Sequence, residues 1–522
     1  MALHLPKTRR EIFCWSMVFF LLGVGIHSVF PVTKIEMGWW TTAASLLVVA
    51  WSFGRGSSRG TWSVWLILGC ALVGGLLRFD ISIPSAASGV MPYFGELSTS
   101  QGRVDSVSAM SKGSRLIVSA SSIDGRELTS PGTHIEVSLF TRSLPSVGSL
   151  VSVSCRLQLL ETNGDSTFWQ FLAKQDVWSQ CRGATRVSIL SLPSPFDVSA
   201  RLQQWRTVVT QRIATLYPHD EATLLSGIMY GDQDLSQEQK DLMRRAGLMH
   251  LVAVSGSNVT IVVSLLQAVI LAIGWNRRRS FWVVTVGIVL FIGFVGASAS
   301  VVRAGIMGWL VLLARQTGRR SSASHILLVT ATIVALLNPW LLAFDAGFDL
   351  SFLATWGLII WTPLIAARAT WLTHRFGLRE AFATTSGATL MTAPYLAWSF
   401  SQTSLAGLLT NLLALPLVPF IMLWGFFSAL WAKGPGSSIV TVPTFGFLRL
   451  LEWIAHLSDY LPFLNLQFAA MNVLWLFGTY GFLLYLWWRL RAKCSLSTEN
   501  GAFRGVNVKH SRDTKSVVNY SQ

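Results

Sequence analysis

The sequence predicts a polytopic α-helical membrane protein of about twelve spans, with a small extracytoplasmic OB-like β-barrel domain inserted after the first three of them. Hydrophobic residues make up 52% of its 522 residues and charged residues only 13%, too few to cover the surface of a soluble protein of this length. Apolar runs long enough to cross a bilayer recur along the chain. They are interrupted between residues 93 and 190, where short apolar runs alternate with polar residues as in half-buried strands.

The chain is strongly basic, with 41 Lys and Arg against 25 Asp and Glu and a formal net charge of +16. In a soluble protein this excess would point to nucleic acid. In a membrane protein, cytoplasmic loops collect Lys and Arg for topology alone. We assign the larger share of the excess to topology and leave an anionic substrate open for the rest.

The first domain, residues 1–80, contains three apolar runs, at 12–30, 39–53 and 62–77. Basic residues ahead of the first run place the N-terminus in the cytoplasm by the positive-inside rule, so the third run ends outside. The first run is long and no small-residue cleavage site follows it, which indicates a retained membrane anchor rather than a signal peptide.

Residues 93–190 form the second domain, predicted to be an OB-like barrel of about five strands. Turn signals such as Asp124-Gly125 separate its apolar runs. Barrels of this type often bind single-stranded nucleic acid through aromatic side chains and a basic groove. The residues that could do so here are Arg103, Lys112, Arg115, Phe140, Arg142 and Trp169. The alternative, that the aromatic side chains fill the barrel, is slightly favoured because basic and acidic residues are nearly balanced across the domain.

Two cysteines, Cys155 and Cys181, lie on what we predict to be the last two strands of this barrel. If the domain lies outside the cytoplasm, its environment permits a disulfide between them. A bond that closes a loop of this size stabilises a fold by about 3 kcal/mol. The other cysteines are assigned no role.

The rest of the chain divides into three parts. Residues 196–246 begin with helical apolar spacing and interspersed arginines, a pattern typical of a helix lying along a membrane surface. Residues 491–522 form a short basic tail, expected in the cytoplasm. Between them, residues 247–490 form the main membrane domain, with basic clusters after every second apolar run, as an alternating topology requires. Its predicted spans are about 248–273, 280–297, 300–314, 324–337, 346–367, 380–400, 404–431, 440–460 and 468–488.

Polar residues within spans are costly unless they face protein or water, so they mark candidate sites. Asp345 and Asp349 lie four residues apart and therefore share a helix face. An ion pair between Arg303 and one of them is at least as well supported as a direct substrate contact. Asn411 stands beside prolines, which indicates a broken helix lining a cavity, the alternative being a simple kink. The candidates along a substrate path are His250, Ser255, Ser257, Asn258, Arg303, Asp345, Asp349, Ser351, Asn411 and Pro416.

Four segments occur in order: GLMHLVAVSGSNV, SVVRAGIM, LLNPWLLAFDAGFDLSFLATWGL and TAPYLAWSFSQTSLAGLLTNLLALPLV. In these segments the chain resembles the ComEC competence proteins, bacterial inner-membrane channels that carry single-stranded DNA into the cytoplasm during natural transformation. The phrase STFWQFLAKQDVW and the spans before it resemble the N-terminal region of that family. The resemblance covers about residues 220–430 and includes Gly247, His250, Ser255, Gly256, Arg303, Asp345, Gly347, Phe348, Ser351, Asn411 and Pro416.

This resemblance implies single-stranded DNA, an external DNA receptor and a cytoplasmic helicase-like ATPase as partners, beside the lipid bilayer, and is compatible with a homodimer. The sequence has no GxxxxGK[ST] loop, so the energy is expected from such a partner. It departs from the family at Asn258, where a histidine is usual. It also lacks the clustered histidine–aspartate motif of the metallo-β-lactamase-like domain that many members carry. We therefore expect no nuclease activity, no metal site and no cofactor.

The rival interpretations are an intramembrane hydrolase and a transporter of another polymer or solute. The segment AVSG at residues 253–256 resembles the serine segment of rhomboid-type proteases. His250 lies on the same helix as Ser255 and points elsewhere, and no other histidine is a convincing base. The sequence thus favours a channel over an enzyme.

Overall fold

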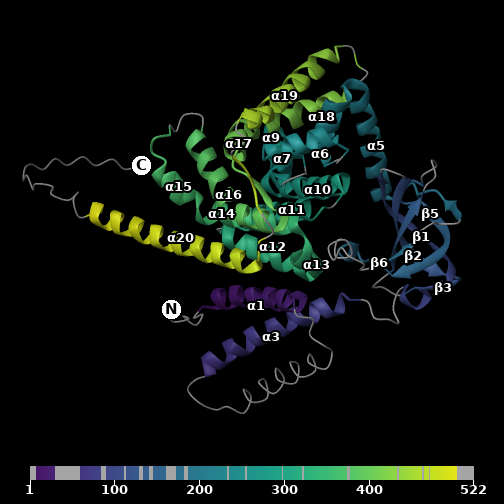
Figure 1. Ribbon diagram of the computed structural model, residues 1–522, viewed down its shortest axis with the longest axis horizontal. Coiled ribbons are helices and arrows are strands. Elements are labelled where there is room, and N and C mark those ends of the chain that lie inside the picture. The colour runs from purple at the N-terminus through teal and green to yellow at the C-terminus, as the bar shows by residue number, and fades with distance from the viewer. Residues whose placement is uncertain are drawn as a thin grey trace, which may run out of the picture. The chain divides into compact units, whose positions relative to one another are not determined.

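The computed structural model describes most of the chain and shows a mainly helical protein with one β-barrel (Figure 1). The described residues are 8–29, 59–83, 90–110, 113–128, 133–139, 145–159, 172–181, 186–231, 234–252, 256–296, 298–319, 322–372, 377–431, 434, 436–460, 464–468 and 471–502. They divide into two compact units. The first contains Met1–Thr355 and Ser404–Asn465, and the second contains Trp356–Thr403 and Leu466–Gln522.

The first unit begins with two apolar helices, α1 (Arg9–Val29) and α3 (Arg59–Ile81). They pack closely at glycines, because a Cβ atom at Gly23 would overlap the carbonyl oxygen of Leu72 and one at Gly75 would overlap that of Phe20. The predicted span at 39–53 lies outside the described residues.

The barrel consists of five strands closed into a ring. Strand β1 pairs with β2, β2 with β4, β4 with β6, and β6 with β5, which returns to β1. Only the β4–β6 pair of this ring is parallel. The short strands β3 and β7 extend the ring beside β2 and β5. The bounds are β1 Leu97–Met110, β2 Gly113–Ile123, β3 Arg126–Glu127, β4 His134–Leu139, β5 Leu150–Leu159, β6 Val177–Cys181 and β7 Arg186–Ser191. The predicted OB-like barrel is therefore confirmed.

The barrel interior is filled by alternate residues of its strands. Val104 lies opposite Val118, and Val118 lies opposite Ile135. All three are fully buried. Because side chains alternate between the two faces of a strand, Arg103, Ser119 and His134 project from the outer surface.

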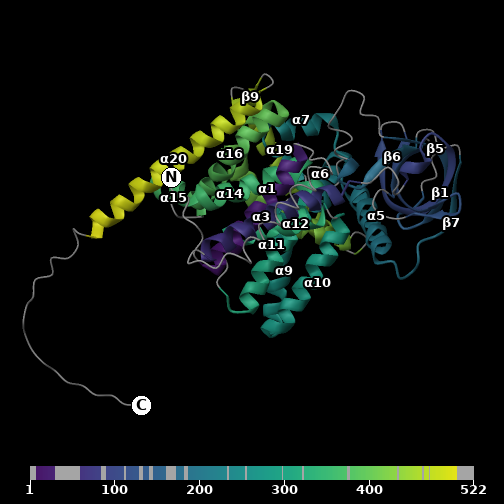
Figure 2. The ribbon, with the colours of Figure 1, turned by 90° about the horizontal axis from the view of Figure 1, so that it is seen from below.

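Helix α5 (Val198–Leu216) connects the barrel to the following helices, and both views place it between them (Figures 1 and 2). Arg206 donates to the carbonyl oxygen of Val295 at 2.9 Å, and Arg212 to that of Ala429 at 3.2 Å. The opposite side of α5 exposes Trp205 and Val208. The membrane-surface location of this helix stays a prediction.

A largely buried helix, α6 (His219–Tyr230), lies at the centre of the helical core. Its Leu225 and Ile228 belong to one apolar cluster with Val259, Ile421 and Leu451 of later helices. The other helices of the first unit are α7 Gln237–Arg245, α8 Met249–Val252, α9 Gly256–Ala272, α10 Arg277–Val295, α11 Ala299–Gln316, α12 Ala323–Leu337, α13 Pro339–Phe344, α17 Gly407–Ala414, α18 Val418–Leu430 and α19 Ser438–His456, with 3-10 turns η1 Met91–Tyr93, η3 Leu415–Leu417 and η4 Leu457–Tyr460.

Helix α14 (Ala346–Ile360) leads from the first unit into the second, and α15 (Thr362–Arg368), α16 (Leu378–Phe400) and α20 (Val473–Ala502) follow. Within the second unit, Tyr480 Oη donates to the carbonyl oxygen of Met391 at 2.8 Å. Strands β8 (Gln402–Ser404) and β9 (Asn465–Gln467) mark the other two places where the chain passes between units.

Five helical segments in the described residues are long and apolar enough to cross a membrane. The α14–α15 pair, bent by 45°, could form a sixth, and α9 and α12 are shorter apolar helices. The five are Arg9–Val29, Val64–Ile81, Arg277–Val295, Gly407–Leu430 and Ser438–Tyr460. A mostly helical chain with several apolar helices and a small barrel is thus established, while the number of about twelve spans stays a prediction.

Candidate functional site

Gly247 lies where two segments of the chain cross with their backbones in contact. It follows α7 with a φ of +67°, a left-handed conformation that glycine adopts most easily. A Cβ atom here would lie 2.8 Å from Gly407 Cα and 3.2 Å from Gly407 N, at the start of α17. Backbone conformation and space therefore both require glycine at this position.

Two hydroxyl groups hold this crossing together. Ser404 Oγ donates to the carbonyl oxygen of Arg245 at 2.6 Å, and Thr410 Oγ1 donates to that of Ala246 at 2.6 Å. Carbonyl groups at a helix C-terminus lack partners within the helix, so these bonds satisfy them. The segments around Gly247 and Gly407, far apart in the sequence, form one structural unit.

Both segments at the crossing depart from regular α-helix. The first passes from α7 through a turn at Gly247 into α8 and then, after residues outside the described part, into α9. The second passes from α17 through η3, which contains Pro416, into α18. Asn411 is 8% exposed, and its Oδ1 is buried without a hydrogen-bond partner among the described residues. Such an atom costs about 1–3 kcal/mol unless a water or ligand meets it.

The polar residues predicted near Gly247 differ in their surroundings. Asn258 is buried, and its Nδ2 donates to the carbonyl oxygen of Ile228 at 2.7 Å, which fastens α9 to α6. Ser257 Oγ donates to Asn258 Oδ1 at 3.3 Å. His250 is exposed, with Nδ1 3.1 Å from the carbonyl oxygen of Gly247. Ser255 lies outside the described residues.

Arg303 is almost completely buried and joins α11 to α14. Its guanidinium donates long hydrogen bonds of 3.5 Å to the carbonyl oxygens of Phe348 and Ser300, and it lies over the Phe352 ring, 5.6 Å from the centroid. Asp345 also acts on it electrostatically. Asp349 and Ser351 are half-buried on the same helix, α14.

Asp345 pairs with a lysine of the barrel domain. Its Oδ2 lies 2.6 Å from Lys174 Nζ, while its Oδ1 accepts the backbone N–H of Phe348 at 2.8 Å and so caps α14. Asn338 Nδ2 donates to the carbonyl oxygen of Lys174 at 2.7 Å. We call residues 172–176, which carry Lys174, the clasp. The sequence-based prediction paired an aspartate with Arg303 and did not foresee this lysine.

Aromatic rings surround the clasp on its helical side. Trp340 of α13 packs on Trp178 of β6 and on Phe79 of α3, with ring centroids 5.3 Å and 4.9 Å apart. Ala173 of the clasp and Val24 of α1 belong to the same apolar cluster. The barrel, the N-terminal helices and α13 therefore meet at one junction.

The other side of the clasp covers the outer face of the barrel. Leu172 and Val177 pack on Ile117 of β2. Asp176 Oδ2 lies 3.3 Å from His134 Nδ1 on β4. The clasp is consequently held between the barrel and the helices.

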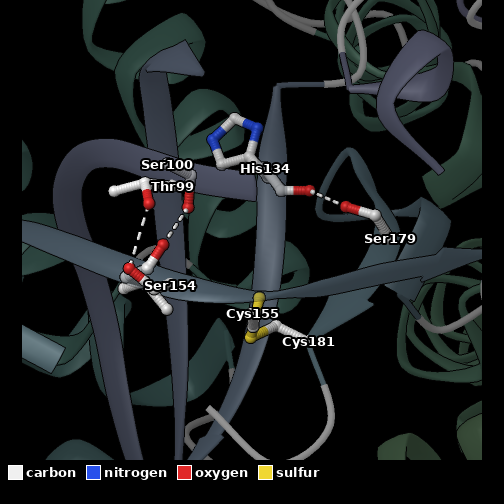
Figure 3. Close-up of a disulfide and its surroundings, with 8 residues drawn as sticks. Thr99, Ser100, His134, Ser154, Cys155, Ser179 and Cys181 are labelled. Atoms are coloured by element: carbon white, nitrogen blue, oxygen red, sulfur yellow. Dashed lines mark hydrogen bonds between the residues drawn. A yellow bond between two sulfur atoms is a disulfide. The ribbon is translucent and has the colours of Figure 1, made fainter. Parts of the chain in front are cut away.

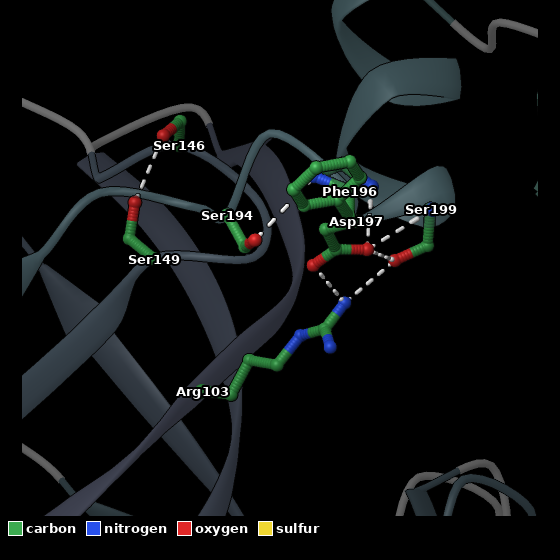
Figure 4. A network of polar contacts seen from close by, with 8 residues as sticks. Arg103, Ser146, Ser149, Ser194, Phe196, Asp197 and Ser199 are labelled. Atoms are coloured by element: carbon green, nitrogen blue, oxygen red, sulfur yellow. Dashed lines mark hydrogen bonds and ion pairs between the residues drawn. The ribbon is translucent and has the colours of Figure 1, made fainter.

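The two described arginines that were candidates for DNA contact both have carboxylate partners. Arg103 Nη2 lies 2.6 Å from Asp197 Oδ2 and donates to Ser199 Oγ at 2.6 Å (Figure 4). Arg115 Nε lies 2.7 Å from the buried Glu136 Oε1. Each would have to leave its partner to bind a phosphate. The other candidates, Lys112, Phe140, Arg142 and Trp169, lie outside the described residues.

Asp197 is shared between the barrel and α5. It caps α5 by accepting the backbone N–H groups of Ser199 and Ala200. Partial burial by itself would raise the pKa of Asp197. The hydrogen bonds from Ser199 and Ala200 and the charge of Arg103 outweigh this and lower the pKa. The carboxylate is thus ionised throughout the physiological pH range.

Cys155 of β5 and Cys181 of β6 are joined by a disulfide, with Cα atoms 5.9 Å apart (Figure 3). Both cysteines are fully buried in the barrel core. The bond ties together two strands that also pair through the backbone.

His134 lies between two aspartates on the outer face of the barrel. Its Nε2 is 3.3 Å from Asp105 Oδ2 and 3.1 Å from Ser119 Oγ, and its Nδ1 is 3.3 Å from Asp176. Hydrogen bonds to Asp105 and Asp176 raise the pKa of His134 to about 9. At neutral pH the imidazolium donates from both nitrogens and links three barrel segments.

We expect the barrel to lose stability between pH 6.5 and 9. Because the pKa of His134 is raised on folding, its contribution is complete below the unfolded pKa of about 6.5 and disappears as pH rises through the folded value. The loss should be about 2 kcal/mol after allowance for solvent at the carboxylates. Protease resistance of the barrel in the full chain, measured from pH 6 to 9.5, tests this. His134→Gln should remove the pH dependence, and an unchanged profile in that variant would contradict the assignment.

Comparison with known proteins supplies the family. A model of the competence protein family matches residues 228–493, just over half of the chain. The chain belongs to the competence protein family. ComE operon protein 3 of Bacillus subtilis (strain 168) is 24% identical over 271 residues, covering 52% of this chain and 34% of that protein. The matched part therefore spans about a third of the relative. No solved structure matches.

The crossing, Arg303 and Asp345 all lie inside the competence region, whereas the barrel and its clasp precede it. The ion pair between Lys174 and Asp345 thus connects the competence region to the domain before it. Sequence reasoning missed Lys174, Asn338 and His134. The sequence feature that could have identified Lys174 is the segment STFWQFLAKQDVW, which resembles the N-terminal region of the family and contains both Lys174 and Asp176.

One further arrangement in this competence-family chain has the spacing of a hydrolase triad. Ser119, His134 and Asp176 are in hydrogen-bond contact in that order. A triad histidine must be neutral to take the proton of serine. His134 Nε2 also lies 3.3 Å from Asp105 Oδ2, and the hydrogen bonds to Asp105 and Asp176 raise the pKa of His134, which disfavours the neutral imidazole that a base requires.

Proposed function

We propose that this chain is a bacterial inner-membrane channel that imports single-stranded DNA during natural transformation. In this proposal it has about twelve spans, both termini in the cytoplasm and the barrel outside. It acts as a channel and not as an enzyme. An external DNA receptor delivers the strand, a cytoplasmic helicase-like ATPase supplies the energy, and the chain itself could work as a homodimer.

The observation that carries the proposal is the crossing of two irregular segments within the competence region, one turning at Gly247 and the other interrupted by the 3-10 turn η3. Gly247 and Gly407 touch through their backbones, and Asn411 adds a buried amide oxygen without a partner among the described residues. Irregular backbone at membrane depth is tolerated where it lines a cavity or is buried in protein. Transporters use helices with interrupted backbone at their substrate sites.

The disulfide supports the external location of the barrel. Disulfides persist in oxidising compartments and are rare in the cytoplasm. Cys155 and Cys181 are within bonding distance and bonded, which fits a barrel that receives DNA before it crosses the membrane.

Uptake of labelled DNA into the cytoplasm tests the proposal. Deletion of the gene should abolish uptake, and the wild-type chain should restore it. Arg303→Ala should lower uptake because it truncates a buried residue that joins α11 to α14 and so disturbs the packing of the two helices. Arg315→Ala, at an exposed position on the same helix, is the matched control and should restore uptake. Membrane levels of each variant are compared by immunoblot. Normal uptake in the deleted strain would refute the DNA-import function.

A further inference from the structure

We propose that Lys174 is a phosphate contact for single-stranded DNA and that Asp345 occupies it until a strand arrives. A DNA phosphate that reaches the clasp takes Lys174 from Asp345, which frees this carboxylate to interact with Arg303. The exchange makes the clasp a sensor of strand arrival at the competence region. This inference rests on the proposed function.

The position of Lys174 in the barrel favours contact with an oligonucleotide. OB-like barrels bind oligonucleotides beside the loops that join strands 1–2 and 4–5. In this barrel the second of these loops is the β5–β6 connection, and the clasp is its described end. Lys174 therefore lies at the ligand-binding edge of the barrel and, unlike the Arg115 pair on the barrel face, also contacts the competence region.

The ion pair is accessible enough for exchange. The Lys174 and Asp345 side chains are 11% and 17% exposed, so solvent reaches the edge of the pair while most of it is covered. A flexible four-carbon stem lets the ammonium move without its backbone. The backbone of the clasp is held separately, by Asn338 at the Lys174 carbonyl oxygen and by the packing of Ala173.

Asp345 keeps other interactions when Lys174 leaves. Its Oδ1 still accepts the Phe348 N–H at the start of α14, and it still lies in the field of Arg303. The cost of breaking the ion pair is reduced accordingly, because the carboxylate is not left as an uncompensated charge. A strand bound at Lys174 thereby strengthens the interaction between Asp345 and Arg303 at the α11–α14 contact, although the strand itself does not touch that contact.

The competing explanation is that the Lys174–Asp345 pair is only a structural link. The two explanations differ in what the two halves of the pair do. A structural link is weakened equally by removing either charge. In the exchange, Lys174→Gln removes a phosphate contact, whereas Asp345→Asn removes the competitor and leaves the lysine available. Asparagine also retains the capping oxygen for Phe348.

The experiment measures binding of fluorescent oligothymidine to the purified full chain in lipid nanodiscs over a range of salt concentrations. Lys174→Gln should weaken binding and reduce the magnitude of the slope of log Kobs against log salt by about 0.7, the value for one phosphate contact on a single strand. Asp345→Asn should bind as tightly as the wild type or more tightly, and Lys174→Arg should behave as the wild type. Thermal melting of each variant confirms that it is folded.

Arg156→Gln removes one exposed basic charge from β5 and controls for net charge. An equal change of slope in Arg156→Gln and Lys174→Gln would overturn the inference, as would equal weakening by Lys174→Gln and Asp345→Asn. Wild-type binding with an unchanged slope in Lys174→Gln would overturn the inference and leave the proposed function in place. A wild-type chain that binds no oligonucleotide would overturn both.

Discussion

Gly247→Ala is expected to destabilise the helical core by about 2–5 kcal/mol and to abolish DNA uptake. The methyl group would meet the Gly407 backbone at 2.8 Å, and backbone atoms at a crossing cannot move aside as a flexible side chain can. Forced overpacking costs about 1–3 kcal/mol, and the left-handed backbone adds about 1–2 kcal/mol for a residue with a Cβ atom. Separation of the two segments would also break the hydrogen bonds from Ser404 and Thr410.

Gly318 provides a control with the same backbone conformation. Its φ is also +67°, but no atom lies within 4 Å of the position a Cβ would take. Gly318→Ala should therefore cost only the backbone part, about 1–2 kcal/mol. The measurement is the thermal unfolding midpoint of each variant in detergent together with DNA uptake in cells. Equal effects of the two substitutions on the unfolding midpoint and on uptake would show that the contact with Gly407 contributes nothing to stability or to function.

Removal of the disulfide by Cys155→Ala with Cys181→Ala is expected to destabilise the barrel by about 3.5 kcal/mol. The bond closes a loop with a sequence separation of 26 residues, and the unfolded chain regains the entropy of that loop when the bond is absent. A small barrel has little other stability to compensate. Protease resistance of the barrel in the full chain, with and without reductant, measures the loss.

The free cysteine of α1 gives the matched control. Cys14 lies outside the barrel and has no disulfide partner among the described residues, so Cys14→Ala should leave the barrel unchanged. After the chain is denatured to expose these two buried cysteines, Cys155 and Cys181 of the wild type should react with a thiol reagent only after reduction. Labelling of both without reductant would contradict a persistent bond and, with it, the external location of the barrel.

Local patterns predicted the elements better than their connections. Alternating apolar residues and turn signals such as Asp124-Gly125 were enough to predict the barrel strands. That β5 returns to β1, and that β4 and β6 run parallel, depends on contacts between distant strands. The same limit applies to the predicted span at 346–367, which is two helices bent by 45° at Trp361. Pro363 marks this break, since proline has no N–H to bond the carbonyl oxygen four residues earlier and is tolerated in the first turn of α15.

The sequence identified individual residues of the candidate site but not the residues that they contact. Prolines beside Asn411 coincide with the 3-10 turn η3, which interrupts the α-helix without a sharp bend. The low frequency of acids in spans singled out Asp345, because a buried carboxylate needs a partner. The sequence could not show which residue is the partner of Asp345, since Lys174 lies 171 residues earlier and in another domain. Likewise nothing local indicates that Gly247 must fit against Gly407.

That separation of 171 residues also orders the assembly of the chain during synthesis. Domains tend to fold as units from the N-terminus, so the barrel strands and their disulfide can form while α11 to α14 are still being made. Asp345 then meets a clasp that is already in place beside β6. The newly synthesised competence helices therefore pack against a surface that has already folded, and a substitution that unfolds the barrel would remove the surface that Trp340 and Asp345 contact.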